Sequence, residues 1–480
     1  MQFHPFGITQ QMLKTAKPLW ILGFRRFGTQ PTTLSRINSH GFLLLVAAFR
    51  RIAVLMILKR NWSLSIAPGI DMHILFLTDN FPPEVNAPAS RTFEHCREWV
   101  KHGEQVTVIT CAPNFPKGRV FEGYRNLLWQ EEEMDGIRVI RVWSYIAANE
   151  GFFKRVIDYL SFMFAGSLAA LFVRRVDVVI GTSPQFFTAC AALATGFCKR
   201  VPWVFELRDL WPESIKAVGA MRDSSIIRLL EKVESFLYRK ACLIVTVTNG
   251  LRQTLMQRGV EGAKIDVVTN GVDLSNFSLQ PKDEQLLLAL GLKGKFVAGY
   301  IGTHGMAHAL DTLLDAAFLL MQTPGAENVM FLFLGSGARK VELIERARKQ
   351  GLLNVLFLDT VPRGEVARYW SLLDVSVIHL RKIELFTSAI PSKLFECMGM
   401  GMPVLHGVAG ESADIVMREQ VGEVFESENA PQLAECLLRL RDDEGRYQQL
   451  RRNALDAAQR YDRKILAMAM LDQVRRAAVS

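Results

Sequence analysis

The sequence predicts an α/β protein with two doubly wound, Rossmann-like domains that face each other across a cleft. At 480 residues the chain is too long for one ordinary domain, given about 150 residues per domain. From Met72 onward, short β-branched apolar runs alternate with longer amphipathic patterns, which is typical of parallel sheets covered by helices on both faces. The alternation stops at a polar stretch, residues 275–285, and then starts again.

The first alternating half is assigned to residues 72–275 and ends in a turn at 269–273. Strands are expected at 73–78, 105–110, 137–143, 177–181, 203–207, 243–247 and 265–269, and helices at 89–102, 185–199, 224–240 and 249–258.

The second half is assigned to residues 286–455, followed by a C-terminal helix in 456–480 that is expected to pack back on the first domain. Strands are expected at 296–301, 329–334, 355–358, 374–379 and 403–406, and helices at 309–322, 338–350, 364–372, 392–400 and 430–440. In such folds ligands bind at the carboxyl ends of the strands and at domain interfaces, so the cleft is the expected site.

Composition excludes several classes of protein. With 49% hydrophobic and 22% charged residues, the chain is neither disordered nor fibrous. Its seven cysteines are scattered, with no Cys-x-x-Cys and no zinc-finger spacing. We therefore expect a reducing compartment and no structural metal.

The excess positive charge lies at the N-terminus. Residues 1–70 contain nine Lys and Arg and no Asp or Glu, so the remaining basic residues balance the 48 acidic ones. The apolar runs 42–49 and 52–58 are too short for a spanning helix. Residues 1–71 fit a bilayer-surface segment, a transit peptide or, as we favour, sequence upstream of a true start at Met72. Nothing in them indicates nucleic-acid binding.

A second apolar run, residues 156–173, borders on the length of a membrane span. Basic pairs flank it at 154–155 and 174–175, and Asp158 interrupts it. A helix lying in the bilayer interface fits this pattern, and an ordinary buried helix fits it equally well.

Two loops are candidates for binding a phosphate group. Residues 79–91 form a Pro-stiffened loop that delivers small residues, Asn86 and Ala87 among them, to a helix start, where exposed N–H groups favour an anion. An ordinary βα connection is the alternative. In the second loop, Gly302, Thr303, His304 and Gly305 follow a strand, so that the amides of 303–306 can cradle a diphosphate, with His304 or His308 as a further donor.

The segment 381–404 is the most informative. Pro391 suits the first position of a helix, after which Lys393 and Glu396 share one helical face. A cation for phosphate and a carboxylate for ribose hydroxyls then point the same way. A surface ion pair is the alternative.

A fourth group lies at the end of the strand 203–207. Glu206, Arg208, Asp209 and Glu213 cluster there, where parallel sheets usually carry catalytic groups. Solvated loop charges are the alternative.

Taken in order, four motifs resemble glycosyltransferase family 4, retaining enzymes of GT-B fold. They are P-P-E-x-x-A-P-A-x-R at 82–91, R-D-L-W-P-E-S at 208–214, N-G-V-D at 270–273 and P-S-K-x-x-E at 391–396. The resemblance is to the branch that serves colanic-acid, O-antigen and related polysaccharide synthesis, including lipopolysaccharide.

This resemblance implies transfer of a sugar, an N-acetylated or deoxy hexose, from a nucleotide diphosphate donor, commonly UDP-linked. The implied acceptor is lipid-linked or a saccharide, at the inner face of the plasma membrane, and the implied enzyme is cytoplasmic and peripheral, with no cofactor and no metal.

The family's site residues carry over as follows. Glu396 matches the second Glu of the Glu-x7-Glu motif, which holds the donor ribose, and Ser388 replaces the first. Thr303 and its His-containing turn replace an Arg and a Lys that many relatives direct at the diphosphate. Arg208 stands where many relatives have a catalytic-region His. Lys393 and Arg381 then supply the cationic charge, with Ser392 beside them.

The implied chemistry is front-face attack with anomeric retention. Arg208, Asp209, Glu206 and Lys393 are the expected catalytic set, the acceptor proton passing to the leaving phosphate, Asp209 or Glu206. Two alternatives stay open, a non-hydrolysing UDP-sugar 2-epimerase of the same fold and an inactive nucleotide-sugar-binding scaffold.

Overall fold

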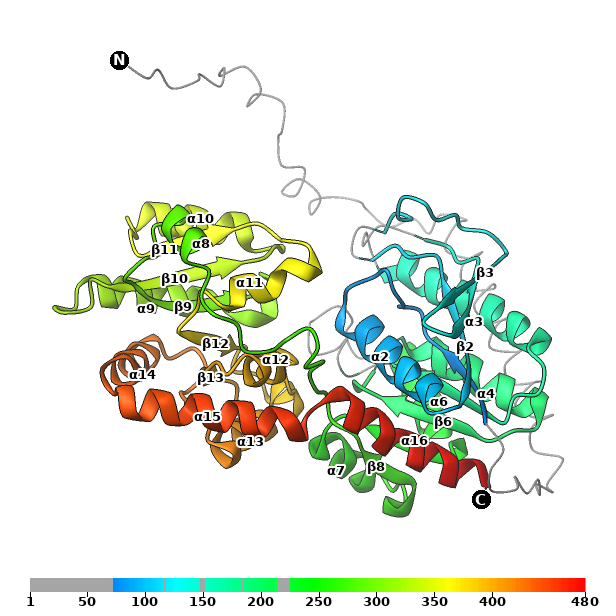
Figure 1. Cartoon of the computed structure of the whole chain (residues 1–480). Coiled ribbons are helices and arrows are strands. Elements are labelled where there is room, and N and C mark those ends of the chain that lie inside the picture. Colours follow the sequence, from blue (N-terminus) through cyan, green and yellow to red (C-terminus); the bar gives the residue numbers. More distant parts are fainter. Residues whose placement is uncertain are drawn as a thin grey trace, which may run out of the picture. The chain divides into compact units, whose positions relative to one another are not determined.

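The computed structural model describes residues 72–115, 118–146, 152–183, 185–211, 213 and 225–479. The predictions for residues 1–71 lie outside these ranges, as do positions 212 and 214 of the second motif. Within them the chain forms two separate sheets with helices on their faces (Figure 1). The predicted α/β class with two doubly wound sheets is confirmed.

The first sheet has eight strands in the order β3-β4-β2-β1-β5-β6-β7-β8, all parallel except the β3–β4 pair. All seven predicted strands are present, with ends within two residues. The strands are β1 (His73–Leu77), β2 (Gln105–Cys111), β3 (Trp129–Met134), β4 (Ile137–Val142), β5 (Val178–Thr182), β6 (Trp203–Leu207), β7 (Leu243–Thr246) and β8 (Ile265–Val267). Its helices are α2 (Ala87–Lys101), α3 (Phe152–Phe172), α4 (Phe186–Lys199), α6 (Ser225–Lys240) and α7 (Asn249–Gln257).

The sequence analysis missed β3, the antiparallel edge strand. Its sequence, WQEEEM, carries three glutamates and only partly buried side chains, so it lacks the apolar run by which the inner strands are found. The turn before β4 was the available signal: Asp135 and Gly136 both have positive φ, 50° and 79°, as a two-residue hairpin turn requires.

The second sheet has six parallel strands in the order β11-β10-β9-β12-β13-β14. The five predicted strands are present, and the three-residue β14 was missed. The strands are β9 (Phe296–Ile301), β10 (Val329–Leu334), β11 (Val355–Leu358), β12 (Val375–His379), β13 (Val404–Gly407) and β14 (Gly422–Val424). The helices are α8 (Glu284–Ala289), α9 (Asp311–Met321), α10 (Lys340–Lys349), α11 (Val366–Trp370), α12 (Lys393–Gly399), α13 (Glu411–Glu419), α14 (Ala430–Asp442), α15 (Glu444–Arg460) and α16 (Arg463–Val479).

Each sheet has one point where the strand order reverses. In the first sheet it lies between β1 and β5, and in the second between β9 and β12. Connections leave these neighbouring strands in opposite directions, and in such folds ligands bind at the carboxyl ends of the strands at this point. The loops that follow β1, β6, β9 and β12 carry most of the predicted site residues.

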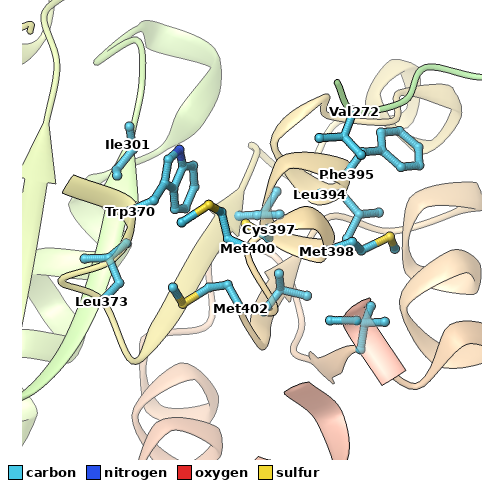
Figure 2. Packing of buried hydrophobic residues seen from close by; sticks show 14 of the residues in the cluster. Val272, Ile301, Trp370, Leu373, Leu394, Phe395, Cys397, Met398, Met400 and Met402 are labelled. Carbon is cyan, nitrogen blue, oxygen red and sulfur yellow. The ribbon is translucent and has the colours of Figure 1, made fainter. Parts of the chain in front are cut away.

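A hydrophobic cluster fixes α12 against the second sheet. Figure 2 shows Leu394, Phe395, Cys397 and Met398 of α12 packed in one cluster with Ile301, the last residue of β9, and all are buried. Burying such side chains contributes roughly 1.5–3 kcal/mol each. This packing sets where the polar side of α12 lies relative to the end of β9.

The N-G-V-D motif has a structural reason. The chain passes Val272 beside Asp462 in a parallel bridge, with the Val272 amide donating to the Tyr461 carbonyl at 3.0 Å. A Cβ on Gly271 would lie 2.3 Å from the Tyr461 oxygen, so only glycine fits.

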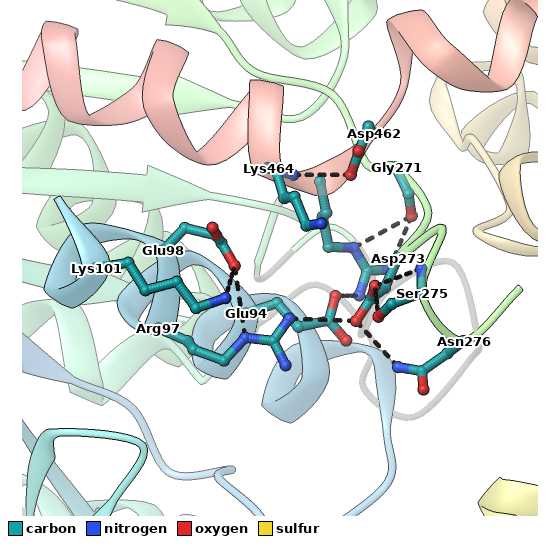
Figure 3. A network of polar contacts seen from close by, with 11 residues as sticks. Glu94, Arg97, Glu98, Lys101, Gly271, Asp273, Ser275, Asn276, Asp462 and Lys464 are labelled. Carbon is teal, nitrogen blue, oxygen red and sulfur yellow. Dashed lines mark hydrogen bonds and ion pairs between the residues drawn. The ribbon is translucent and has the colours of Figure 1, made fainter.

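A polar network joins this crossing to α2 (Figure 3). Arg463 forms an ion pair with Glu94 and donates a hydrogen bond to the Gly271 carbonyl, and Arg97 donates to Asp273. Beyond it α16 lies along α2, where the Trp99 indole donates to the Ala467 carbonyl at 2.8 Å.

Candidate active site

At the end of β9 a lysine lies directly against a glycine. Gly302 has φ +143°, and a Cβ built there would lie 2.5 Å from the Lys393 Nζ and 2.4 Å from its Cε. The side chain therefore occupies space that any other residue at 302 would fill. Sequence reasoning proposed the turn and the lysine separately, and the fold brings them together at the switch point of the second sheet.

Lys393 is the first residue of α12 and is largely withdrawn from water. Its Nζ lies 4.8 Å from the centre of the Tyr300 ring, over the ring face. Burial lowers the pKa of Lys393, and the nearby Glu396 opposes this shift. A correction concerns Pro391: it precedes Ser392, the cap residue of α12, and so is not the first helical residue.

A second glycine turn, which the sequence analysis missed, packs behind the first. The His304 amide donates to the Ser336 carbonyl at 2.9 Å. Cβ atoms on Gly335 and Gly337 would lie 1.9 Å and 2.4 Å from the carbonyl oxygens of Gly302 and His304. The signal was Gly-Ser-Gly directly after a predicted strand. The His304 amide is therefore bonded inside the protein and cannot join a diphosphate cradle, which corrects the prediction that it would.

The His304 side chain is also not a ligand donor in this structure. Its ring is fully buried beside the Phe333 and Phe357 rings, with centroids 6.2 and 6.3 Å away. Burial lowers the pKa of His304 to about 4, and Lys340 and Lys393 act in the same direction. A neutral, buried imidazole packs as an aromatic residue, and this corrects the predicted role of His304.

Thr303 and Gly305 flank His304 and remain candidates. Thr303 is exposed and its carbonyl accepts from the Tyr300 hydroxyl at 2.8 Å, which fixes the turn. Gly305 begins the short helical turn 306–308, and its carbonyl accepts from the His308 amide. Burial likewise lowers the pKa of His308 to about 4.

Arg381 reaches the same turn from β12. Its amide donates to the Ala307 carbonyl at 2.8 Å, and its Nε is buried with no hydrogen-bond partner among the described residues. Ser392 caps α12 beside Lys393, and Ser388 closes the helical turn 384–388 that leads to it. The Lys393 side chain and the Arg381 backbone thus both contact the 302–308 segment, where β9 and β12 end.

On the first sheet, Asn86 has a clear local role. It caps α2, with its Oδ1 accepting from the Ala89 amide at 2.9 Å, and its Nδ2 donates to Asn80. Ala87, the first helical residue, is exposed. Because the cap uses the Ala89 amide and Pro88 has no N–H, Ala87 is the one of these three residues whose amide can meet an anion.

Glu206 lies in a buried ion pair. Its Oε1 accepts from the Arg91 Nε at 2.8 Å, both side chains being 1% exposed. Arg91 also donates to the carbonyls of Val268 and Thr269, at 2.9 and 2.7 Å. Burial raises the pKa of Glu206, but Arg91 and Arg208 outweigh burial and hold it below its usual value. This geometry favours a positioning role, and proton transfer to Glu206 stays a prediction.

Arg208 and Asp209 share one anchor. Both amides donate to the Ser183 Oγ, at 2.7 and 3.3 Å, which joins the ends of β5 and β6. Burial lowers the pKa of Arg208 to about 10, against the effect of Glu206. Its Nη1 is buried without a partner in the described part of the chain.

Asp79, which follows β1, is a residue the sequence analysis passed over. Burial raises the pKa of Asp79, and Arg208 is among the groups that oppose the rise. Its place just after the first strand was the signal available. Glu213, in contrast, pairs with Arg258.

Among the described residues, no group of three or more His, Cys, Asp and Glu is arranged to hold a metal ion. The predicted metal-free reaction therefore stays a prediction about the chemistry.

Comparison with known families gives two consecutive matches. Residues 86–271 match the model of a glycosyl transferase 4-like domain, and residues 295–443 match the model of glycosyl transferases group 1. The first range covers the Asn86 cap and the Arg208 loop. The second covers the Gly302 turn and Lys393.

Two curated relatives are similar over about half of the chain. A probable glycosyltransferase, WbjE, of Pseudomonas aeruginosa is 24% identical over 253 residues, which is 52% of this chain and 61% of the relative. A putative teichuronic acid biosynthesis glycosyltransferase, TuaH, of Bacillus subtilis is 26% identical over 258 residues, 52% of this chain and 62% of the relative. The aligned regions thus span less than two thirds of these relatives.

Solved structures share the fold over most of the chain. A sucrose-phosphate synthase of Thermosynechococcus elongatus aligns with a TM-score of 0.65 at 17% identity, covering 84% of this chain and 98% of that one. Anabaena HepE, in complex with UDP and glucose, aligns with a TM-score of 0.64 at 19% identity, covering 84% and 99%. WaaG, involved in lipopolysaccharide biosynthesis, gives 0.59 at 15% identity, covering 84% and 99%.

Proposed function

Because the chain belongs to the family 4 glycosyltransferases of GT-B fold, we propose that it transfers a sugar from a nucleotide diphosphate to an acceptor hydroxyl. One observation carries the proposal: Lys393 lies against the Gly302 turn at the switch point of the second sheet. A cation next to exposed main chain at this point suits a diphosphate.

The leaving diphosphate gathers negative charge as the glycosidic bond breaks. Lys393 is proposed to meet that charge from its place against the Gly302 turn, with Arg381 as a second cation and with main-chain dipoles from Thr303 and Gly305. Because Lys393 is already desolvated, its interaction with a developing charge is stronger than in water. Single donors of this kind are worth about 2.7–4 kcal/mol in other enzymes.

The donor nucleotide is proposed to be UDP. Glu396 lies one helical turn beyond Lys393 on the same side of α12, partly exposed, where its carboxylate can accept from ribose hydroxyls. The UDP complex of the structurally similar Anabaena protein supports the choice of nucleotide.

For the first sheet we propose a role in orienting the acceptor. Its hydroxyl attacks the anomeric carbon on the face that the diphosphate leaves, with retention, and its proton passes to the leaving phosphate or to Asp209. Glu206 is less suited as the acceptor of this proton because Arg91 already holds it as a buried carboxylate. Arg208 then stabilises charge beside the reacting groups.

We further propose that the acceptor is lipid-linked or a saccharide of a surface polysaccharide, at the inner face of the plasma membrane. The roles of TuaH and WaaG, in teichuronic acid and lipopolysaccharide biosynthesis, support this class of pathway. An N-acetylated or deoxy hexose is the proposed sugar.

A donor screen tests the proposal. The purified chain is incubated with UDP-, GDP- and dTDP-sugars, with and without a lipid-linked acceptor, and products are identified by mass spectrometry. We expect transfer that requires the acceptor and releases UDP. An epimerised nucleotide sugar formed without acceptor supports the epimerase alternative, and UDP binding without turnover on any acceptor supports the scaffold alternative.

A further inference from the structure

One side of α3 presents a continuous apolar stripe to solvent. Four of its residues, seven, four and three positions apart, lie on one helical face, and Phe172 extends that face at the C-terminal end. Each exposes half or more of its surface, from 50% to 68%. They are Ile157, Phe164, Leu168, Leu171 and Phe172.

The opposite side of α3 packs against neighbouring elements of the fold. Phe162, Met163, Ala169 and Ala170 are buried, and the helix packs on α4 and β2. The Lys199 Nζ donates to the Val173 carbonyl just past the end of the helix at 2.5 Å. The helix is therefore held from Phe162 to its C-terminal end.

A second element extends the stripe. The Trp129 ring meets the Phe172 ring edge-on, with centroids 6.3 Å apart, and Leu127 and Leu128 precede it. Leu128 is 82% exposed. We call the five α3 residues together with Trp129 the apolar face. Patches that join side chains from separate segments mark interaction sites more often than single exposed residues do.

Positive charge borders the apolar face. Arg174, Arg175 and Arg200 are exposed near the C-terminal end of α3, and Lys154 and Arg155 are exposed near its start. Of the three glutamates on β3, Glu131 pairs with Arg138 and Glu132 with Arg141, and Glu133 is exposed.

The negative charge of Asp158, the one acidic residue in the sequence of α3, is also partly suppressed. Burial raises the pKa of Asp158 to about 7, with Asp79 adding to the rise and Arg155 opposing it. An apolar stripe with an aromatic rim and basic ends is the pattern of a helix that lies in an anionic membrane interface.

We propose that the apolar face docks the enzyme on an anionic lipid bilayer, with α3 lying in the plane of the interface. The segment Lys154–Phe172 is long and apolar enough to cross a membrane, and 28% of it is buried in the protein. Because its inner side packs on α4 and β2, a spanning position would require α3 to leave the fold. The inference rests on the proposed function and names the surface that meets the acceptor's membrane.

The docked helix also leads toward the proposed acceptor site. Asp158 and Tyr159, near the start of α3, interact electrostatically with Asp79, which follows β1 and in turn interacts with Arg208. A lipid lying beside the start of α3 thus brings its head group toward these residues while its chain stays in the bilayer.

Vesicle binding of the full chain tests the proposal. The variant Phe164→Ser/Leu168→Ser/Leu171→Ser is compared with the wild type and with Leu288→Ser/Val341→Ser/Leu353→Ser, a matched control whose three residues are 67%, 69% and 87% exposed. Co-sedimentation uses vesicles of equimolar phosphatidylcholine and phosphatidylglycerol, and vesicles of phosphatidylcholine alone. We expect the α3 variant to lose at least ~10-fold in partition coefficient and the control to change less than about twofold.

Each outcome of these experiments either supports or overturns the proposed docking of α3 on the bilayer. All variants keep residues 1–71, so a difference between them reports on α3. Equal binding of the α3 variant and the control overturns the proposal, as does equal binding of the wild type to both kinds of vesicle. A wild-type dimer in sedimentation velocity that the α3 variant abolishes would assign the apolar face to a second copy of the chain. Because no donor or acceptor is present, the result is independent of whether the chain transfers sugar, and turnover on a water-soluble acceptor is expected to be unchanged in the α3 variant.

Discussion

The substitution Lys393→Met removes the charge at the proposed diphosphate site and keeps most of the apolar stem against Gly302. If the ammonium stabilises the leaving group, its loss costs about 2.7–4 kcal/mol in the transition state, and kcat/KM falls by about 10²–10³-fold. Stability should change much less. Burial of Lys393 disfavours its charged form, and its contact with the Tyr300 ring, 4.8 Å away, favours it by roughly 0.5–2 kcal/mol, so the two effects oppose each other.

The assay measures UDP release at substrate concentrations well below KM, together with the free energy of unfolding from urea titration. Lys382→Met is the control, because Lys382 is exposed and pairs with Glu426 at 2.6 Å on the surface. A kcat/KM of Lys393→Met within about threefold of the wild type would contradict the proposed role of the ammonium. A parallel fall of activity and stability would contradict it too, because that result would make Lys393 a structural residue.

Three further predictions concern binding and stability. Glu396→Ala should weaken UDP binding in calorimetry with little change in fold, and an unchanged Kd would remove its ribose role. Arg91→Met should lower the free energy of unfolding by about 3–5 kcal/mol because Glu206 stays buried and unpaired. Arg138→Met, whose pair is 46% and 41% exposed, should cost less than about 1 kcal/mol, and equal losses would contradict the distinction. For His406, burial lowers the pKa to about 3, so the unfolded state binds its proton first and stability falls as pH drops below about 6.5, by about 1.4 kcal/mol per unit. His406→Leu should therefore gain about 2 kcal/mol relative to the wild type between pH 6.5 and 5, and parallel urea curves at both pH values would refute this.

The inner strands were predictable because their burial leaves an apolar run in the sequence. β9, β10 and β11 match their predicted ranges. The edge strand β3 was not predictable from the sequence. It has one solvated face that carries charges such as Glu131 and Glu133, and only its pairing with β4 defines it as a strand. Strand pairing is a tertiary property, and the Asp135-Gly136 turn was the local sequence feature that indicated it.

The candidate site was partly predictable. Motif spacing placed Lys393 and Gly302 in suitable local elements, but their contact depends on how α12 packs into the hydrophobic cluster of the second sheet, which no local pattern encodes. His304 was misassigned for the same reason. A histidine after a strand suits a ligand site or a core equally well, and the aromatic neighbours that decide come from β10 and β11.

The most direct test is a crystal structure of the full chain with bound UDP. If Lys393 and the 302–305 turn hold the diphosphate, a β-phosphate oxygen will lie within about 3 Å of the Lys393 Nζ, next to the turn, and the ribose hydroxyls will bond the Glu396 carboxylate. A diphosphate bound elsewhere, with Lys393 still over the Tyr300 ring, would contradict this binding mode.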